Sequence, residues 1–192
     1  MELILASRSP RRRELLTHAG YRFTVMPPSE SAEGGICRGE TPSELVARLA
    51  YQKAREIASR IEEGLVLGCD TVAECHGQIL GKPRDREHAG EMLRLMRGRI
   101  HQVYSGVCLW QRPKDTTQVD VAVTRLRMDE ISDQQLSDYL DTDQWCDKAG
   151  AFGFQDGLDW VHIEAGSESN VVGLPMELLE SMLAERLGER GP

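Results

Sequence analysis

The continuous apolar run from Leu65 to Cys69 constrains the fold most, because such a run is typical of a strand buried on both faces. Residues 2–6 form a second short apolar run. Residues 101–110 and 117–128 alternate apolar and polar side chains, as half-exposed strands do, on either side of a turn at residues 113–115. Because helical patterns interleave with strands of both kinds, the sequence predicts an α/β or α+β fold built on a mixed sheet.

Proline, glycine and capping residues mark where the helices begin and end. Residues 41–44 form a capping box with proline at the first helical position, and the helix that follows carries an apolar stripe with Lys53 beside it. Pro10 likewise begins a helix that Gly20 closes. The other elements predicted from such signals are strands over 21–26 and 160–163, a hairpin around His76 and Gly77, helices over 86–97 and from Ser132, and a last helix from Pro175.

The chain has the length of one domain and an acidic overall charge. Its 192 residues, 40% of them hydrophobic, can bury a core, and we expect a single domain over residues 1–192. The net charge of −8 argues against extended nucleic acid and anionic membranes as partners. Five cysteines without a CxxC pair predict neither a disulfide framework nor a zinc site. Since no stretch resembles a signal peptide or a membrane span, the sequence predicts a cytoplasmic protein.

A dense positive cluster interrupts this acidic sequence at residues 7–13, Ser-Arg-Ser-Pro-Arg-Arg-Arg. The cluster combines a strand-to-helix turn, the backbone N–H groups of a helix N-terminus and several guanidinium groups, all of which favour phosphate oxygens. A solvated first turn is the plainer alternative, but the helix dipole disfavours cations at that end. The cluster therefore predicts a polyphosphate ligand.

Other candidate functional residues carry weaker signals. Asp70 ends the buried strand run, where open α/β sheets present ligand-binding groups, and it is either a base or metal ligand or a turn-forming residue. Lys53 and Lys82 are single lysines, which are more often solvated surface charges. Residues 147–155 suit either a loop that closes on a flat ligand or a glycine-rich turn, and we interpret residues 169–175 as a structural turn.

Residues 5–12, 68–71, 81–83, 147–155 and 172–175 form five blocks in a specific order. Together these blocks resemble the Maf family of nucleoside triphosphate pyrophosphatases, over nearly the whole chain. The resemblance implies an α/β fold with an elongated mixed sheet flanked by helices and two lobes around a nucleotide cleft, as in inosine triphosphatases. It also implies hydrolysis of a nucleoside triphosphate to the monophosphate and pyrophosphate, a divalent cation (Mg²⁺ or Mn²⁺) and a homodimer.

The resemblance assigns roles to individual residues. Asp70 resembles the catalytic base and is a metal-ligand candidate. Thr71 and Gln155 are similar to residues of the subgroup that prefers dTTP and UTP, and Arg11, Thr71 and Gln155 lie where the family sets base preference. A primary amide suits uracil or thymine because it offers both a donor and an acceptor. The residues similar to those that bind substrate are Ser7, Arg11, Arg12, Lys53, Thr71, Lys82 and Gln155.

Two positions depart from the family pattern. The chain has Glu30 and Glu33 where members often carry an aspartate-glutamate pair, so either is a candidate for a second metal-binding carboxylate. Asp156 stands where glycine is frequent, and its carboxylate either alters selectivity or faces solvent.

Two other functions are open on the sequence alone. One is the same reaction on a modified purine such as 7-methyl-GTP. The other is a non-catalytic nucleotide-sensing protein that affects cell division. RNA binding through residues 8–13 is disfavoured, because an acidic chain with 5% aromatic residues offers few stacking surfaces.

Overall fold

A seven-stranded mixed sheet forms the centre of the protein, in the order β2-β1-β3-β5-β6-β7 with β4 also paired to β3. The computed structural model describes residues 2–29, 32 and 34–188. The β1–β2 and β1–β3 pairs are parallel and the other pairs are antiparallel, which confirms the predicted mixed sheet. The strands are β1 (Leu3–Ala6), β2 (Phe23–Val25), β3 (Gly64–Cys75), β4 (Gln78–Leu80), β5 (Ile100–Arg112), β6 (Thr116–Met128) and β7 (Val161–Ala165).

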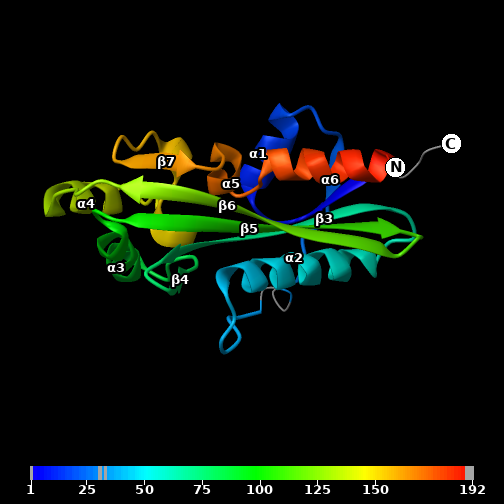
Figure 1. Ribbon diagram of the computed structural model, residues 1–192, viewed down its shortest axis with the longest axis horizontal. Helices are drawn as coiled ribbons and strands as arrows, with labels where there is room; N and C mark the ends of the chain where they lie inside the picture. Colours follow the sequence, from blue (N-terminus) through cyan, green and yellow to red (C-terminus); the bar gives the residue numbers. More distant parts are fainter. Residues whose placement is uncertain (1, 30–31, 33, 189–192) are drawn as a thin grey trace.

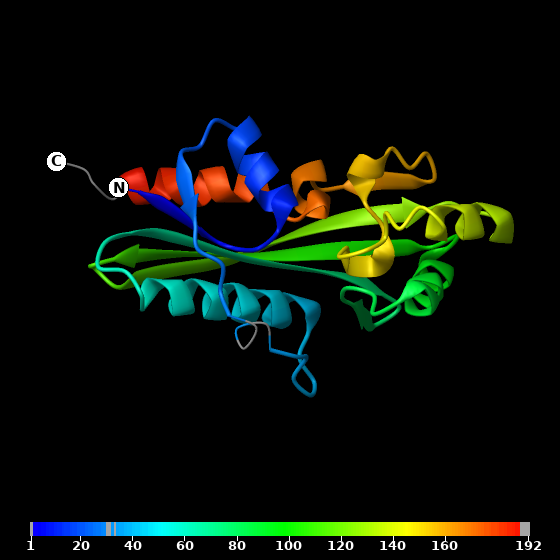
Figure 2. The ribbon, with the colours of Figure 1, turned by 180° about the vertical axis from the view of Figure 1, so that it is seen from behind.

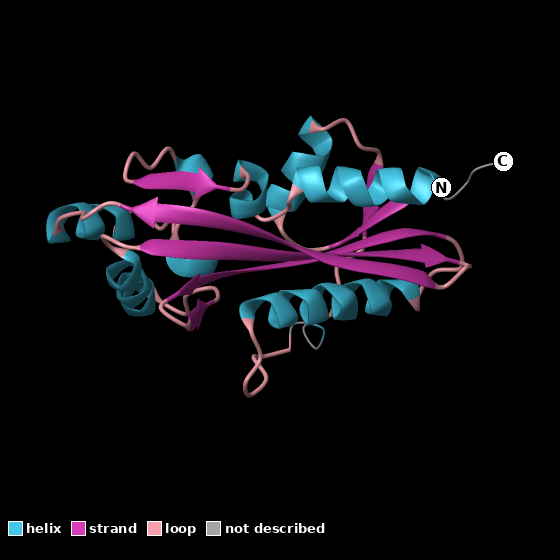
Figure 3. Ribbon diagram, viewed as in Figure 1, coloured by secondary structure: helices cyan, strands magenta, loops and turns pink. Residues whose placement is uncertain are grey.

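Three long strands, β3, β5 and β6, run along the length of the molecule and give it an elongated shape (Figure 1). One long helix, α2, covers one face of the sheet, while α1 and α6 lie on the opposite face (Figures 1 and 2). Helices and strands thus form separate layers (Figure 3). The helices are α1 (Pro10–His18), α2 (Pro42–Ala58), α3 (Arg86–Met96), α4 (Asp133–Leu140), α5 (Glu168–Val172) and α6 (Met176–Gly188), with 3₁₀ turns η2 (Ala149–Ala151) and η3 (Phe154–Asp156).

The hydrophobic core is divided between the two ends of the sheet. At one end, residues of β1 and β3 pack with α1 and α6 on one face of the sheet and with α2 on the other. At the other end, α3 and α4 pack with β7 and residues 145–161. This division confirms the two lobes that the resemblance implies. Fully buried examples are Leu5, Leu16, Leu67 and Leu179 at the first end and Leu93, Met96, Leu126 and Met128 at the second.

Helix α2 lies directly against the sheet because two glycines lie beneath it. A Cβ added at Gly68 of β3 would come within 2.9 Å of the backbone nitrogen of Ala54, and one at Gly106 of β5 would come within 2.8 Å of the backbone nitrogen of Ala47. Side chains at these positions would hold the helix away. The glycines therefore bring α2, and Lys53 on it, down onto the middle of the sheet.

The prediction that Asp70 ends a strand is wrong. Strand β3 pairs with β5 without interruption from Gly64 to Glu74, so Asp70 lies within the strand. The apolar pattern resumes after Thr71. The polar residues Asp70 and Thr71 fit within the strand because the edge of β3 opposite β5 is open at this point. On that edge β1 pairs with β3 as far as Gly68, and β4 begins to pair at Ala73. Asp70 and Thr71 lie in the gap between β1 and β4.

Most local signals in the sequence are confirmed. The predicted capping box at Thr41 is formed, a second capping box begins the helix predicted from Ser132, and Asp85 caps α3. Residues 169–175, interpreted as a structural turn, instead contain most of the short helix α5, which Ser167 caps. A helix of five residues is too short to show a periodic apolar pattern. In the described residues, no helix has both the length and the apolar character that crossing a membrane requires.

Candidate active site

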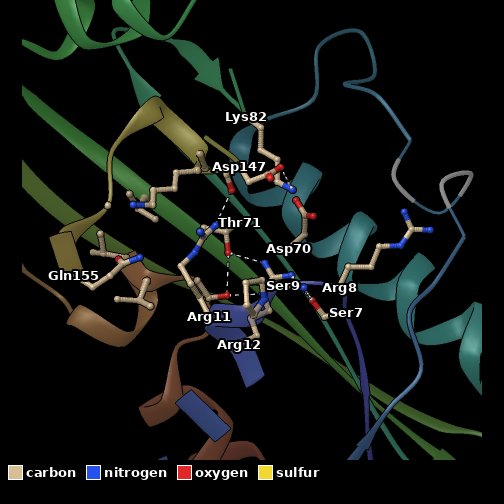
Figure 4. Close-up of a pocket in the computed structure, with 18 of the residues that line it drawn as sticks. Ser7, Arg8, Ser9, Arg11, Arg12, Asp70, Thr71, Lys82, Asp147 and Gln155 are labelled. Carbon is tan, nitrogen blue, oxygen red and sulfur yellow. Dashed lines mark hydrogen bonds and ion pairs between the residues drawn. The ribbon is translucent and has the colours of Figure 1, made fainter. Parts of the chain in front are cut away.

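A cavity of about 560 Å³ opens at the gap beside β3. Side chains converge on it from the β1–α1 turn, α2, β3 and residues 146–156, as Figure 4 shows. Glu30 and Glu33, the candidates for a second metal-binding carboxylate, lie outside the described residues. All of the other site residues predicted from the sequence line the cavity: Ser7, Arg11, Arg12, Lys53, Asp70, Thr71, Lys82 and Gln155.

Arg12 is fixed by bonds to three separate parts of the chain. Its Nε donates to the carbonyl oxygen of Gly173 at 2.7 Å, Nη1 donates to Ser7 Oγ at 3.2 Å, and Nη2 donates to Thr71 Oγ1 at 3.1 Å. The residue is only 8% exposed. Ser7 Oγ also accepts the backbone N–H of Ser9 at 3.1 Å, which shapes the turn before α1. A buried, fully oriented guanidinium is thereby presented at the start of a helix, where anions bind readily.

The hydroxyl of Thr71 is committed to the protein rather than free for a ligand. Besides accepting from Arg12, it lies 2.8 Å from Ser105 Oγ on β5 and donates to the carbonyl oxygen of Gly173 at 3.2 Å. Ser105 is completely buried and in turn donates to the carbonyl oxygen of Asn170 at 3.4 Å. Ser105 was not among the predicted site residues. The signal that identifies it is the strand register, in which Thr71 pairs with Ser105, and a single sequence does not show that register.

Lys53 and Asp70, which both line the cavity, form an ion pair with Nζ and Oδ1 2.6 Å apart. Their side chains are 5% and 14% exposed, so the pair is largely shielded from water. A single lysine is more often a solvated surface charge, and the burial of Lys53 overturns that interpretation here. Lys53 fixes the orientation of the Asp70 carboxylate.

The loop formed by residues 146–156 lies across the cavity and is contacted by two cations that also line it. Arg11 Nη2 donates to the backbone carbonyl of Asp147 at 2.6 Å, and Lys82 Nζ lies 3.4 Å from Asp147 Oδ1. Burial, followed by the charge of Arg12, lowers the pKa of Arg11. Gly150 adds a backbone bond from its N–H to the carbonyl oxygen of Gly81 at 3.1 Å. The loop is therefore placed by the same cations that a phosphate ligand would engage.

Gln155 and Asp156 lie at the far end of this loop. The Gln155 side chain is exposed and lines the cavity on the side away from Asp70 (Figure 4). Asp156 points inward, with a side chain 10% exposed, and forms an ion pair with Lys148. Of the two outcomes left open for Asp156, exposure to solvent is therefore wrong. Lys148 also lines the cavity, although its place in the sequence did not mark it as a site residue.

The cavity is a positive site in a negative protein. Six cationic side chains line it against two carboxylates, although the whole chain carries a net charge of −8. Such a concentration of cations around a helix N-terminus suits a polyphosphate. The cations are Arg8, Arg11, Arg12, Lys53, Lys82 and Lys148, and the carboxylates are Asp70 and Asp147.

Two known proteins are similar to this chain in sequence. A protein of Rhodopirellula baltica named dTTP/UTP pyrophosphatase is 59% identical over 182 residues, which cover 94% of this chain and 80% of that protein. A protein of the same name from Clostridioides difficile is 40% identical over 184 residues, which cover 95% of this chain and 94% of that protein.

The fold is similar to that of a solved structure, and the sequence matches one protein family. The structure of a HAM1 protein from Coxiella burnetii aligns with a TM-score of 0.52 at 15% identity, covering 96% of this chain and 99% of that chain. That likeness supports the fold alone. Residues 2–186 match the family described as Maf-like protein. Because this match spans the strands, the turn and the loop that build the cavity, the chain belongs to the Maf family.

Proposed function

We propose that this protein hydrolyses nucleoside triphosphates, with dTTP and UTP preferred, to the monophosphate and pyrophosphate. The observation that carries the proposal is the shielded Asp70 carboxylate, held 2.6 Å from Lys53 in a cavity with five further cationic side chains. The names of the relatives at 59% and 40% identity support the same substrates. The cavity draws residues from Ser7 to Gly173, so we also propose that the whole chain acts as one domain.

The cations define where the triphosphate lies. Arg12 and the first backbone N–H groups of α1 bind phosphate oxygens at one wall, while Lys53 and Lys82 approach from the other. Arg11 and Lys82, which contact Asp147 in the structure, exchange those contacts for phosphate oxygens. A triphosphate bound in this way places its phosphate chain beside Asp70 and its base toward Gln155.

Asp70 acts as the general base. Its carboxylate accepts a proton from a water molecule as that water attacks the α-phosphorus, and the bond from phosphorus to the bridging oxygen of pyrophosphate breaks. Lys53 keeps the carboxylate in one orientation through their 2.6 Å contact. The cationic side chains stabilise the negative charge that develops on the departing pyrophosphate.

The donor set at Asp70 fits a divalent cation that is shared with the substrate. Within the described residues, no three His, Cys, Asp or Glu side chains gather into a metal site. Asp70 would therefore hold Mg²⁺ or Mn²⁺ together with phosphate oxygens and with Glu30 or Glu33. When bound, the cation lowers the pKa of a coordinated water and neutralises phosphate charge.

Gln155 sets the preference for pyrimidines that present a carbonyl group beside an imide N–H. Its primary amide donates to a carbonyl oxygen and accepts from the adjacent imide N–H, the arrangement that uracil and thymine both present. Thr71 contributes indirectly, because its hydroxyl holds Arg12.

The proposal is tested by measuring pyrophosphate release from a panel of nucleoside triphosphates with Mg²⁺ or Mn²⁺. The expected result is rapid release from UTP and dTTP, and a rate at least about 100-fold lower for Asp70→Asn. The control is Asp141→Asn, which alters an exposed pair with Arg86. Release from 7-methyl-GTP in preference to UTP would favour the modified-purine alternative, and metal-independent nucleotide binding without release would favour the sensing alternative.

We further propose that the protein acts in the cytoplasm as a homodimer. Its five cysteines are all free thiols, three of them buried, which suits a reducing compartment. Sedimentation equilibrium measures the dimer, and a mass equal to one chain at micromolar concentration would contradict it.

A further inference from the structure

A shielded ion pair lies inside the loop formed by residues 146–156, next to the proposed base-binding side chain. Lys148 Nζ pairs with Asp156 Oδ2, and the two side chains are 11% and 10% exposed. Lys148 and Gln155 both line the cavity, and Asp156 directly follows Gln155. The pair therefore joins the two ends of the segment that carries Gln155.

The surroundings of the pair hold it in one arrangement. The hydroxyl of Tyr139, a residue 5% exposed, donates to Asp156 Oδ2 at 3.4 Å. The Tyr139 ring packs edge-on against Trp160, with centroids 5.4 Å apart. A Cβ added at Gly153 would come within 2.8 Å of Lys148 Cε, so the loop backbone also presses against the pair. Asp156 is thus anchored to the core of the second lobe.

Stability alone does not explain this arrangement. Removing two charges from water costs about as much as their attraction returns, so a buried ion pair contributes little net stability and is better suited to fixing one geometry. Here the geometry that it fixes is the position of Gln155 relative to the cavity. The pair also holds the Lys148 ammonium group at the wall of the cavity.

We propose that Asp156 is a positioning residue for base selection: by pairing with Lys148 and Tyr139 it orients Gln155 toward the base of a bound pyrimidine nucleotide. This inference rests on the proposed function, because it requires a nucleotide in the cavity. The substrate class that it concerns is nucleotides whose base carries a carbonyl beside an imide N–H, as opposed to the amino group of cytosine.

The test measures the ratio of kcat/KM for UTP to that for CTP in five variants, one of which combines Gln155→Ala with Asp156→Ala. Gln155→Ala removes the proposed base contact, and Asp156→Ala removes its support. In the double variant Lys148→Met/Asp156→Leu, both charges are replaced by apolar groups of similar size, which keeps the loop packed. Asp141→Ala breaks the exposed Arg86–Asp141 pair and serves as the matched control.

The expected result is a fall of about tenfold in the ratio for Gln155→Ala, as expected for loss of one hydrogen bond. Asp156→Ala and the double variant show a similar fall, and combining Asp156→Ala with Gln155→Ala adds nothing further. The control keeps the wild-type ratio. A purely structural role would lower Tm in Asp156→Ala but leave the ratio unchanged.

Two results overturn the inference, and they are distinct from failure of the proposed function. If the wild type discriminates between UTP and CTP and the folded double variant keeps that ratio, Asp156 does not position Gln155. If the effects of Gln155→Ala and Asp156→Ala multiply, the two residues act independently. If the wild type releases no pyrophosphate from any triphosphate, the proposed function itself is wrong and the inference fails with it.

Discussion

Replacing Gly68 with alanine tests how the fold sets the distance between Lys53 and Asp70. A Cβ at Gly68 would lie 2.9 Å from both the nitrogen and the Cβ of Ala54, and closer still to the carbonyl oxygen of Ala50, whereas ordinary contact begins at 3.4 Å. The obstructing atoms are backbone atoms and a Cβ, so no rotamer change relieves the overlap. Helix α2 must therefore withdraw from β3 by about 1 Å.

This displacement has consequences for both catalysis and stability. Lys53 travels with α2 away from Asp70, which it contacts at 2.6 Å in the structure. Because misplacing a group in the reacting centre by about 1 Å costs about 100-fold in rate, we expect kcat/KM for UTP to fall by that factor. Overpacking costs about 2 kcal/mol, which lowers Tm by about 4–8 °C in a chain of this size.

Pyrophosphate release and thermal unfolding measure the two effects separately. Gly35→Ala is the matched control, because a Cβ at Gly35 meets no heavy atom within 4 Å. It should change neither quantity. If Gly68→Ala retains the Tm and the kcat/KM of the wild type, the packing argument is refuted. If Tm falls while kcat/KM is unchanged, the glycine sets the packing of α2 but not the geometry of the ion pair.

Three further predictions concern single features of the structure. Thr71→Val removes the acceptor of Arg12 Nη2, so KM for UTP should rise about tenfold with a smaller change in kcat, while the exposed Thr116→Val has no effect. Burial lowers the pKa of His101 from 6.5 to about 4. As the pH falls, the unfolded chain therefore binds a proton at this histidine before the folded chain does. The free energy of unfolding, measured with urea, should then fall by up to about 3 kcal/mol between pH 6.5 and 4. The fall should be smaller in His101→Phe. Pyrophosphate at 100 times its Kd should raise Tm by about 5–10 °C in thermal unfolding, and by less in Arg12→Met. If His101→Phe loses as much stability as the wild type over this pH range, the histidine argument is wrong. If pyrophosphate raises the Tm of Arg12→Met as much as that of the wild type, the argument for Arg12 is wrong.

The elements that could be predicted from the sequence are those whose signals are local. The capping box at Thr41 is a contact between residues three positions apart, and the structure forms it as expected. Gly20 likewise adopts a positive φ of 77°, which closes the first helix. The turn before α1 is also local, and the structure places residues 7–12 of the predicted cationic cluster on the wall of the cavity.

The features that escaped prediction depend on contacts between distant segments. Ser105 holds Thr71 only because β5 pairs with β3 in one register. The burial of Lys53 depends on how closely α2 approaches the sheet. Asp156 reaches Lys148 through the path of an irregular loop that contains positive φ angles at Gly150 and Ala151. A single sequence carries no information about these distances.

The position of the cavity follows from how β1 and β3 differ in length. Strand β1 ends at Ala6, opposite Gly68, so the chain can turn at Ser7 and start α1 beside the sheet. Strand β3 continues, and its pairing with β5 fixes the backbone of Asp70 opposite Gly106. Because Gly106 has no side chain, α2 can lie close on the same part of the sheet. A short strand, a long strand and a close helix thus bring the arginines of residues 8–12, Lys53 and Asp70 together around one cavity, although these three parts lie far apart in the sequence.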